Sequence, residues 1–154
     1  MVWVPRESAR QWLSVASSAD GTKLVAVENT GLIYTSTDSG VSWTPRENTR
    51  EWRSVASSAD GTKLAAVVLN GLIYTSTDSG VSWTPRESVR NWYRIASSAD
   101  GNKLVAAVVG GQIYTSNPST GTTISGGQSS TLELVYGGAG KWVAVNQQGS
   151  ITLQ

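Results

Sequence analysis

The sequence predicts an all-β protein, a β-propeller of four-stranded antiparallel blades with four blade equivalents in the chain. The segment Gly31–Glu47 recurs letter for letter as Gly71–Glu87, an offset of 40 residues, and repeats of this length are typical of solenoids, propellers and arrays. Within each repeat the apolar residues alternate with the short period of strands, between turns rich in Gly, Asp, Asn and Ser. We therefore expect strands throughout and no helix.

The second repeat shows the strand order expected of a blade. We expect an inner strand over Trp52–Ser58, a second over Lys63–Val68, a third over Leu72–Thr77 and an outer strand over Val81–Glu87. A turn around Asp60 separates the first two strands, because Asp and Gly favour tight reversals. Four antiparallel strands in about 40 residues make one propeller blade.

The repeats are expected at 12–47, 52–87, 92–127 and 132–154, and residues 2–7 match the outer strand that the last repeat lacks. Pairing this N-terminal strand with the C-terminal strands would complete the last blade and leave no open sheet edge. Closure within one chain gives a four-bladed monomer, and reciprocal exchange gives an eight-bladed two-fold homodimer. The sequence leaves both open, because four blades curve strongly while small inner-strand residues would allow close packing.

Composition narrows the function classes. A chain of 154 residues can bury roughly 68–70% of its unfolded surface, enough for an independent core. The net charge of +1, with Arg and Glu interleaved, favours neither nucleic acid nor an anionic membrane as a partner. No apolar run approaches the length of a membrane span, and we recognise no signal peptide. We therefore expect a soluble protein and assign it to no cellular compartment. Because His and Cys are absent, we expect no metal site, no cofactor and no Ser-His-Asp catalysis.

The sharpest motif is the segment Ser36–Trp43, repeated as Ser76–Trp83. It matches the pattern S/T-x-D-x-G-x-x-W, and the chain thereby resembles the Asp-box repeat family, the bacterial neuraminidase repeats of sialidases and of many non-enzymatic propellers. The Asp can accept hydrogen bonds from its own turn and the Gly permits a positive φ. We expect a structural role for these residues: Asp38, Gly40, Trp43, Asp78, Gly80 and Trp83. A weaker similarity to WD40 repeats lacks that family's Gly-His and Trp-Asp pairs.

The resemblance to sialidases raises the question of an enzyme. In that family three arginines hold the substrate carboxylate, a Tyr with a Glu supplies the nucleophile and an Asp is the acid/base. Arg10, Arg50 and Arg90 recur on the connections between blades, each near a repeated Glu, which favours local pairing. Glycoside hydrolysis usually needs two carboxylates in different environments, whereas the five Asp residues all lie in repeated turns. We expect no catalytic residue, and a sialidase-like glycosidase is the least favoured function.

The near-identical repeats differ mainly at two connections. One leads from an outer strand into the next blade, and the other joins the second and third strands of a blade. In a four-stranded meander these connections emerge on the same side, and binding residues commonly lie on such loops. Neutral variation of exposed loops explains the same pattern equally well.

Aromatic and basic side chains accompany these connections. The candidate ligand-binding residues are Arg10, Trp12, Arg50, Trp52, Arg90 and Trp92, since a Trp ring beside polar groups can stack on a sugar. The alternative is that each Trp wedges between adjacent blades. We therefore expect a non-catalytic recognition propeller for a glycan or protein ligand. The other class is a structural, recently amplified or engineered blade array without a specific ligand.

Overall fold

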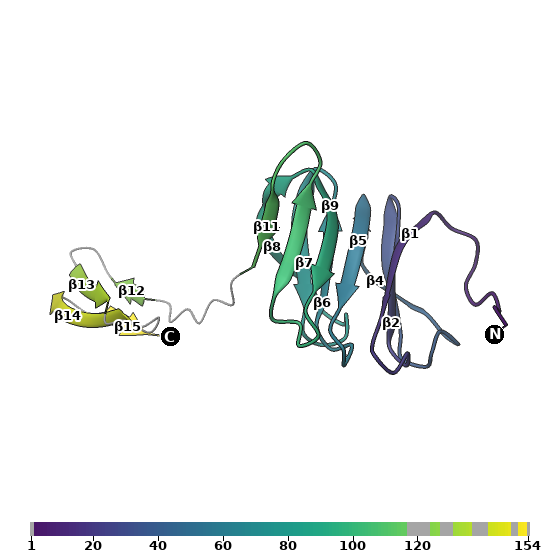
Figure 1. The fold of residues 1–154 in the computed structure, drawn as a ribbon, viewed down its shortest axis with the longest axis horizontal. Coiled ribbons are helices and arrows are strands. Elements are labelled where there is room, and N and C mark those ends of the chain that lie inside the picture. The colour runs from purple at the N-terminus through teal and green to yellow at the C-terminus, as the bar shows by residue number, and fades with distance from the viewer. Residues whose placement is uncertain (1, 117–123, 127–130, 137–141, 149–150, 154) are drawn as a thin grey trace. The chain divides into compact units, whose positions relative to one another are not determined.

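The computed structural model describes residues 2–116, 124–126, 131–136, 142–148 and 151–153. The chain divides into two compact units, Met1–Pro118 and Ser119–Gln154. Every regular element among the described residues is a β-strand (Figure 1), which confirms the expected all-β class. A search of the described residues for a helix able to cross a membrane finds none.

The first unit contains three antiparallel meanders, here called blades 1, 2 and 3 (Figure 1). Blade 1 consists of β1 (Trp12–Ser17), β2 (Leu24–Glu28), β3 (Gly31–Ser36) and β4 (Thr44–Arg50). Blade 2 consists of β5 (Trp52–Ser57), β6 (Leu64–Val68), β7 (Gly71–Ser76) and β8 (Thr84–Arg90). Blade 3 has β9 (Trp92–Ser97), β10 (Leu104–Val108) and β11 (Ile113–Thr115). Each strand pairs with the next along the chain, as the predicted blade requires.

The outer strand of each blade starts later than the sequence predicts. In blade 2 it begins at Thr84 and not at Val81, because the Asp78 carboxylate accepts the Ser82 amide at 2.9 Å and holds that segment in a turn. The strand also runs further, to Arg90, after a positive φ of 60° at Glu87. Arg50 and Arg90 therefore end outer strands and face Gly31 and Gly71 across the sheet. The sequence analysis instead placed these two arginines on the connections between blades.

The blades stack face to face through two apolar clusters. We call the face of a blade that packs on the preceding blade its leading face, and the opposite one its trailing face. Between blades 1 and 2 the trailing face supplies Val25, Val27 and Ile33, and the leading face supplies Trp52, Val55, Leu64, Ala66, Val68 and Tyr74. The equivalent cluster between blades 2 and 3 contains Ala56, Ala65, Val67, Ile73, Trp92, Ile95 and Ala106. The core of this unit therefore consists of two equivalent interfaces between successive blades.

Hydrogen bonds between blades repeat as well. The Val55 amide donates to Ser14 Oγ at 3.2 Å, and one repeat later the Ile95 amide donates to Ser54 Oγ at 3.3 Å. The turns are joined by backbone bonds, from the Ala19 amide to the Ala59 carbonyl and from the Ala59 amide to the Ala99 carbonyl, both at 2.7 Å. Because these bonds satisfy backbone groups at the inner edge of each sheet, they fix how one blade sits on the next.

The two outermost faces of this unit are exposed. On the leading face, Val55 and Ile95 are 5% and 7% exposed, whereas the equivalent Val15 of blade 1 is 71% exposed. On the trailing face, Ile33 is fully buried and the equivalent Ile113 of blade 3 is 73% exposed. The same apolar positions are therefore buried inside the stack and open at both of its ends.

The second unit contains β12 (Ile124–Gly126), β13 (Thr131–Tyr136), β14 (Trp142–Gln148) and β15 (Ile151–Leu153). Strand β13 pairs with β14, and β12 pairs with β15, although the sequence placed residues 124–126 at the outer edge of the third repeat. Residues 2–11 form no strand, and Trp3 is 89% exposed. Completion of the last blade by residues 2–7 thus stays a prediction, as do the repeat boundaries.

Candidate functional site

The two variable connections of each blade lie side by side. We call their common surface the loop face: residues 8–11, 48–51 and 88–91 together with the turns at 28–30, 68–70 and 108–110. In blade 1 the Asn29 amide donates to the Gln11 carbonyl at 2.8 Å, and Leu69 and Val109 make the same bond to Glu51 and Asn91 at 2.9 Å. This pairing places the variable residues of each blade together, as the meander topology predicted.

An arginine, a tyrosine and a tryptophan stand together at the loop face of every blade. The guanidinium carbons of Arg10, Arg50 and Arg90 lie over the rings of Tyr34, Tyr74 and Tyr114, 4.9, 4.6 and 4.7 Å from the ring centroids. Each Tyr also meets a Trp edge to face, at centroid distances of 5.1 to 5.2 Å. The stacking holds each guanidinium plane over its ring, so that the N–H groups at the edge of the plane point away from the ring and can meet an acceptor.

The tyrosines were not among the expected site residues. Their signal was present, because Tyr34, Tyr74 and Tyr114 recur at the same offset as the arginines. Arg50 ends β4 of blade 1 and Arg90 ends β8 of blade 2, whereas the tyrosines that they cover lie in the following blade, so these residues become neighbours only when one blade packs on the next.

The tryptophans divide into two groups. Trp52 and Trp92 are fully buried between blades, so their rings offer no surface on which a sugar could stack. This arrangement is the alternative in which each Trp wedges between adjacent blades. Trp12 is partly exposed because no blade precedes it within the described residues, and its Nε1 donates to the Ser8 carbonyl at 3.3 Å.

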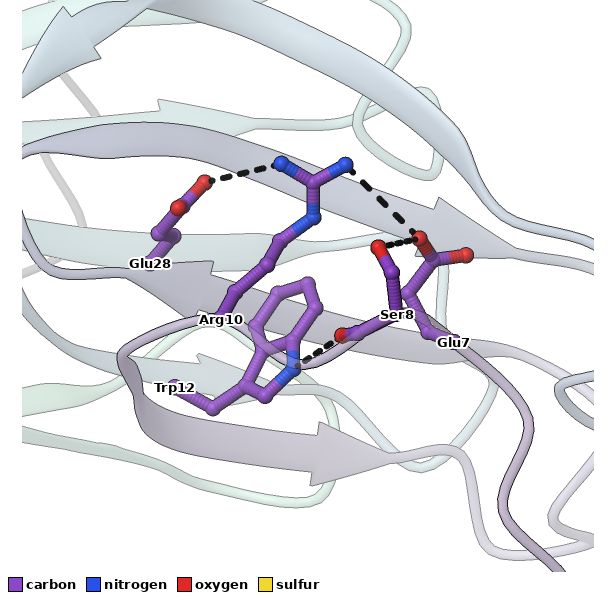
Figure 2. Close-up of polar contacts among 5 residues, drawn as sticks. All are labelled: Glu7, Ser8, Arg10, Trp12 and Glu28. Atoms are coloured by element: carbon purple, nitrogen blue, oxygen red, sulfur yellow. Dashed lines mark hydrogen bonds and ion pairs between the residues drawn. The ribbon is translucent and has the colours of Figure 1, made fainter.

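The three arginines differ in the negative charge around them. Figure 2 shows Arg10 between two carboxylates, with Nη2 3.8 Å from Glu7 and Nη1 3.7 Å from Glu28. Among residues 2–116, Glu47 is the one carboxylate within ion-pair distance of Arg50, at 3.4 Å, because Val68 stands where blade 1 has Glu28. Arg90 has no carboxylate within ion-pair distance among residues 2–116, since Val108 occupies that position and Glu87 bonds to Ser88 instead. The positive charge is progressively less neutralised from blade 1 to blade 3.

A depression of about 690 Å³ opens on the loop face of blade 1, lined by Ala9, Arg10, Gln11, Glu28, Asn29 and Thr30. Its lining is mostly polar, and Asn29 Nδ2 donates to Gln11 Oε1 at 3.1 Å across it. A shallow polar surface of this kind suits an extended ligand better than a small enclosed one.

The Asp-containing loops lie away from this surface and are occupied by their own hydrogen bonds. Asp38 accepts from the Ser42 amide at 2.9 Å and from the hydroxyls of Ser36 and Ser42 at 2.8 and 2.6 Å. Trp43 Nε1 donates to the Gly40 carbonyl at 3.1 Å and closes the loop. Asp78, Gly80 and Trp83 make the same bonds in blade 2. Both oxygens of each carboxylate accept hydrogen bonds from their own turn, which supports a structural role.

These bonds lower the pKa of the aspartates and couple stability to acidity. Hydrogen bonds from Ser42 and Ser36 lower the pKa of Asp38 to about 2 from an ordinary 3.8, and Ser82 and Ser76 do the same for Asp78. Bonds from Ser18 and Thr22 lower the pKa of Asp20 to about 2, and those from Ser98 and Asn102 act likewise on Asp100. A depressed pKa in the folded state stabilises the fold above the unfolded value, and this contribution is lost as the pH falls.

We expect the melting temperature to be steady above pH ~5 and to fall as the pH drops from ~5 towards ~2, because the unfolded chain then binds protons that the folded aspartates do not. Thermal unfolding followed by circular dichroism over this range measures the fall. An Asp38→Asn, Asp78→Asn double variant should have a lower melting temperature at neutral pH. Its melting temperature should also fall less on acidification than that of the wild-type protein. An equally steep fall in that variant would contradict the assignment.

The pKa shifts of the described carboxylates all have one direction. A general acid for glycoside hydrolysis needs a raised pKa, whereas every shifted carboxylate in residues 2–116 has a lowered one. Groups of three or more acidic, His or Cys side chains that could hold a metal are also lacking in the described part of the chain. Glu133 lies outside the residues whose side chains are described.

The stacked antiparallel blades define this chain as part of a β-propeller, and the similar solved structures are propellers too. No family model and no curated protein matches the sequence. YCF48 bound to a D1 peptide aligns with a TM-score of 0.58 and 19% identity over 70% of this chain and 38% of that chain. YCF48 from Cyanidioschyzon merolae aligns with a TM-score of 0.63 and 16% identity, over 91% of this chain and 39% of that chain.

An enzyme is similar as well. The GH74 enzyme of Niastella koreensis aligns with a TM-score of 0.54 and 28% identity, over 68% of this chain and 16% of that chain. The chain therefore spans less than two fifths of each of these proteins. The comparisons establish the propeller fold.

Proposed function

We propose that this chain is a non-catalytic recognition propeller that binds a carboxylate-bearing segment of another protein at the loop face of blades 2 and 3. One observation carries the proposal: Arg10 is held between two carboxylates, whereas Arg50 has one and Arg90 has none among residues 2–116. Arg50 Nε and Arg90 Nε are moreover buried without a hydrogen-bond partner there. A buried donor left without a partner is unfavourable, and the proposed ligand would meet the more accessible Nη groups of these arginines.

The chemistry favours a carboxylate. A planar guanidinium binds a carboxylate through two parallel hydrogen bonds, and stacking on an aromatic ring fixes its plane. An extended peptide with Asp or Glu side chains about one blade apart could contact Arg50 and Arg90 together. The similarity to YCF48, one structure of which is bound to a D1 peptide, supports a peptide ligand in this fold.

A glycan is the second candidate, and a sialidase-like activity the third. The burial of Trp52 and Trp92 removes two rings that a repeated sugar site would use, and a protein ligand is therefore preferred. The absence of a raised carboxyl pKa among the described side chains supports a non-catalytic role.

Fluorescence anisotropy with labelled peptides that carry no, two or four Glu residues in an otherwise identical Gly-Ser background tests the proposal. We expect affinity to rise with Glu number and to fall with salt, and Arg50→Ala or Arg90→Ala to weaken binding about tenfold, as charged hydrogen bonds are worth roughly 1.5–3 kcal/mol. Arg86→Ala is the matched control, because Arg86 is exposed on β8 and bonds Thr75 at 3.3 Å. Equal losses in Arg86→Ala and Arg90→Ala, or hits only on a glycan array, would refute a carboxylate site.

A further inference from the structure

The surroundings of the repeated arginine become more apolar from blade 1 to blade 3. In blade 1, Ala9 and Asn29 line the depression on the loop face together with Arg10. Because the blades are repeats, the residues at the same two positions stand beside the arginine of each blade. These residues are Ala9 and Asn29 in blade 1, Thr49 and Leu69 in blade 2, and Val89 and Val109 in blade 3. The arginine of blade 3 thus has two valines as neighbours.

Both valines of blade 3 are exposed. Val89 is 67% exposed and Val109 is 53% exposed. The first position is exposed in every blade, since Ala9 and Thr49 are exposed as well. At the second position, Leu69 is still partly exposed although blade 3 packs on blade 2. Side chains at both positions are thus open to solvent inside the stack, and apolar side chains that gather at such a place mark a contact surface.

The backbone holds these valines beside Arg90. Val89 directly precedes Arg90 in the chain. The amide of Val109 donates to the carbonyl of Asn91, the residue that follows Arg90, at 2.9 Å. Because the guanidinium of Arg90 is itself fixed over the ring of Tyr114, a cationic group and two apolar side chains are kept close together on the loop face.

Charge and apolar surface change in the same direction along the stack. Figure 2 shows Arg10 between the carboxylates of Glu7 and Glu28, whereas Arg90 has no carboxylate within ion-pair distance in residues 2–116. Val108 accounts for part of this difference, because it takes the place of Glu28. The arginine with the least neutralised charge is therefore also the one with the most apolar neighbours. This combination complements a ligand that presents a negative charge and an aliphatic side chain together.

We propose that the loop face of blade 3 recognises an acidic residue together with an aliphatic residue two positions away from it in an extended peptide. The inference rests on the proposed function and adds the second part of the recognised segment. Arg90 binds the carboxylate through its Nη groups, and the aliphatic side chain packs on Val89 and Val109. The spacing follows from the extended conformation, because side chains two residues apart lie on the same face of a strand.

Two labelled peptides of the same composition test the spacing. One contains Val-Ser-Glu-Ser-Val and the other Ser-Val-Glu-Val-Ser, in the same Gly-Ser background, so they differ only in which side chains share a face with the Glu. We expect fluorescence anisotropy to show about fivefold tighter binding of the first peptide, because its valines can cover the apolar surface of blade 3. The ratio of the two affinities should be the same in low and high salt, since the peptides carry equal charge.

Serine variants of the protein test the assignment to blade 3. A Val89→Ser, Val109→Ser double variant should bind the two Glu peptides with nearly equal affinity, whereas Arg90→Ala should weaken the binding of both. Val41→Ser is the matched control, because Val41 is 61% exposed in the Asp-containing loop, and it should keep the full preference. Both valines of blade 3 are exposed, so we expect the double variant to fold, and circular dichroism checks this.

The outcomes separate this inference from the proposed function. Equal affinities of the wild-type protein for the two Glu peptides, with weaker binding of Val-Ser-Gln-Ser-Val, would overturn the inference and leave the carboxylate site in place. The same preference in the folded double variant as in Val41→Ser would also overturn it. A Gln peptide that binds as tightly as its Glu counterpart would overturn the proposed function, and this inference with it.

Discussion

Replacing Trp52 with alanine will destabilise the protein by about 3–5 kcal/mol, the usual loss for a fully buried Trp. Trp52 is fully buried and belongs to the cluster that joins blades 1 and 2, and it meets Tyr74 edge to face at 5.2 Å. Its removal leaves a cavity in that interface. Since small domains are stable by only about 5–15 kcal/mol, we expect the urea unfolding midpoint to fall steeply.

Two phenylalanine variants give a sharper comparison. Trp52 Nε1 is buried without a hydrogen-bond partner within the described residues, whereas Trp92 Nε1 donates to the Ser88 carbonyl at 3.1 Å. Trp52→Phe removes an unpaired donor and Trp92→Phe breaks a bond, so Trp92→Phe should be the less stable by about 1 kcal/mol. Equal midpoints, or the opposite order, would show that the burial of the rings alone governs these positions.

Gly61→Ala will destabilise the protein by about 2–4 kcal/mol, and Gly21→Ala by only about 1–2 kcal/mol. Both glycines have a positive φ, 68° and 73°, and a side chain in that region strains the backbone by about 1–2 kcal/mol. A Cβ on Gly61 would stand 2.8 Å from the Lys23 Cβ of the preceding blade, whereas nothing lies within 4 Å of one on Gly21. The additional loss at Gly61 is the overpacking of the inter-blade contact, commonly 1–3 kcal/mol.

Urea unfolding of the two variants at low protein concentration measures this difference. The two positions are equivalent in the repeat, so backbone strain cancels in the comparison. A Gly21→Ala loss as large as that of Gly61→Ala would mean that another blade covers the turn of blade 1 under the same conditions.

The sequence predicted the strands of each blade well because they depend on local pattern. The inner and middle strands of blade 2 start and end within a residue or two of expectation, and the Asp78 loop makes the predicted backbone bonds. The outer strand was misplaced because the loop holds Ser82 through a side-chain bond that hydrophobic alternation does not register. Local residue patterns therefore predicted the inner and middle strands correctly, and a local side-chain hydrogen bond explains the error in the outer strand.

The site depended on contacts between segments and was predicted only in part. Arg50 and Arg90 were recognised from their recurrence. The tyrosines beneath them and the missing carboxylates emerge only from the packing of each blade on the next and from the burial of Val68. The packing of one blade on the next decides whether Trp52 faces a ligand or a neighbouring blade. The residue pattern within one repeat carries no information about that packing. The role of Glu28 is visible only beside Arg10.

The repeated bonds from Ser14 to Val55 and from Ser54 to Ile95 bear on how such a chain can change its length. Each blade meets only its two neighbours, so a duplicated unit of about 40 residues brings both a complete leading face and a complete trailing face. Adding or deleting a whole unit leaves every remaining junction unaltered, whereas a partial unit would separate a face from its counterpart. Gene duplication in this array is therefore tolerated in steps of one blade, and the identical segments at Gly31–Glu47 and Gly71–Glu87 have the spacing of one such step.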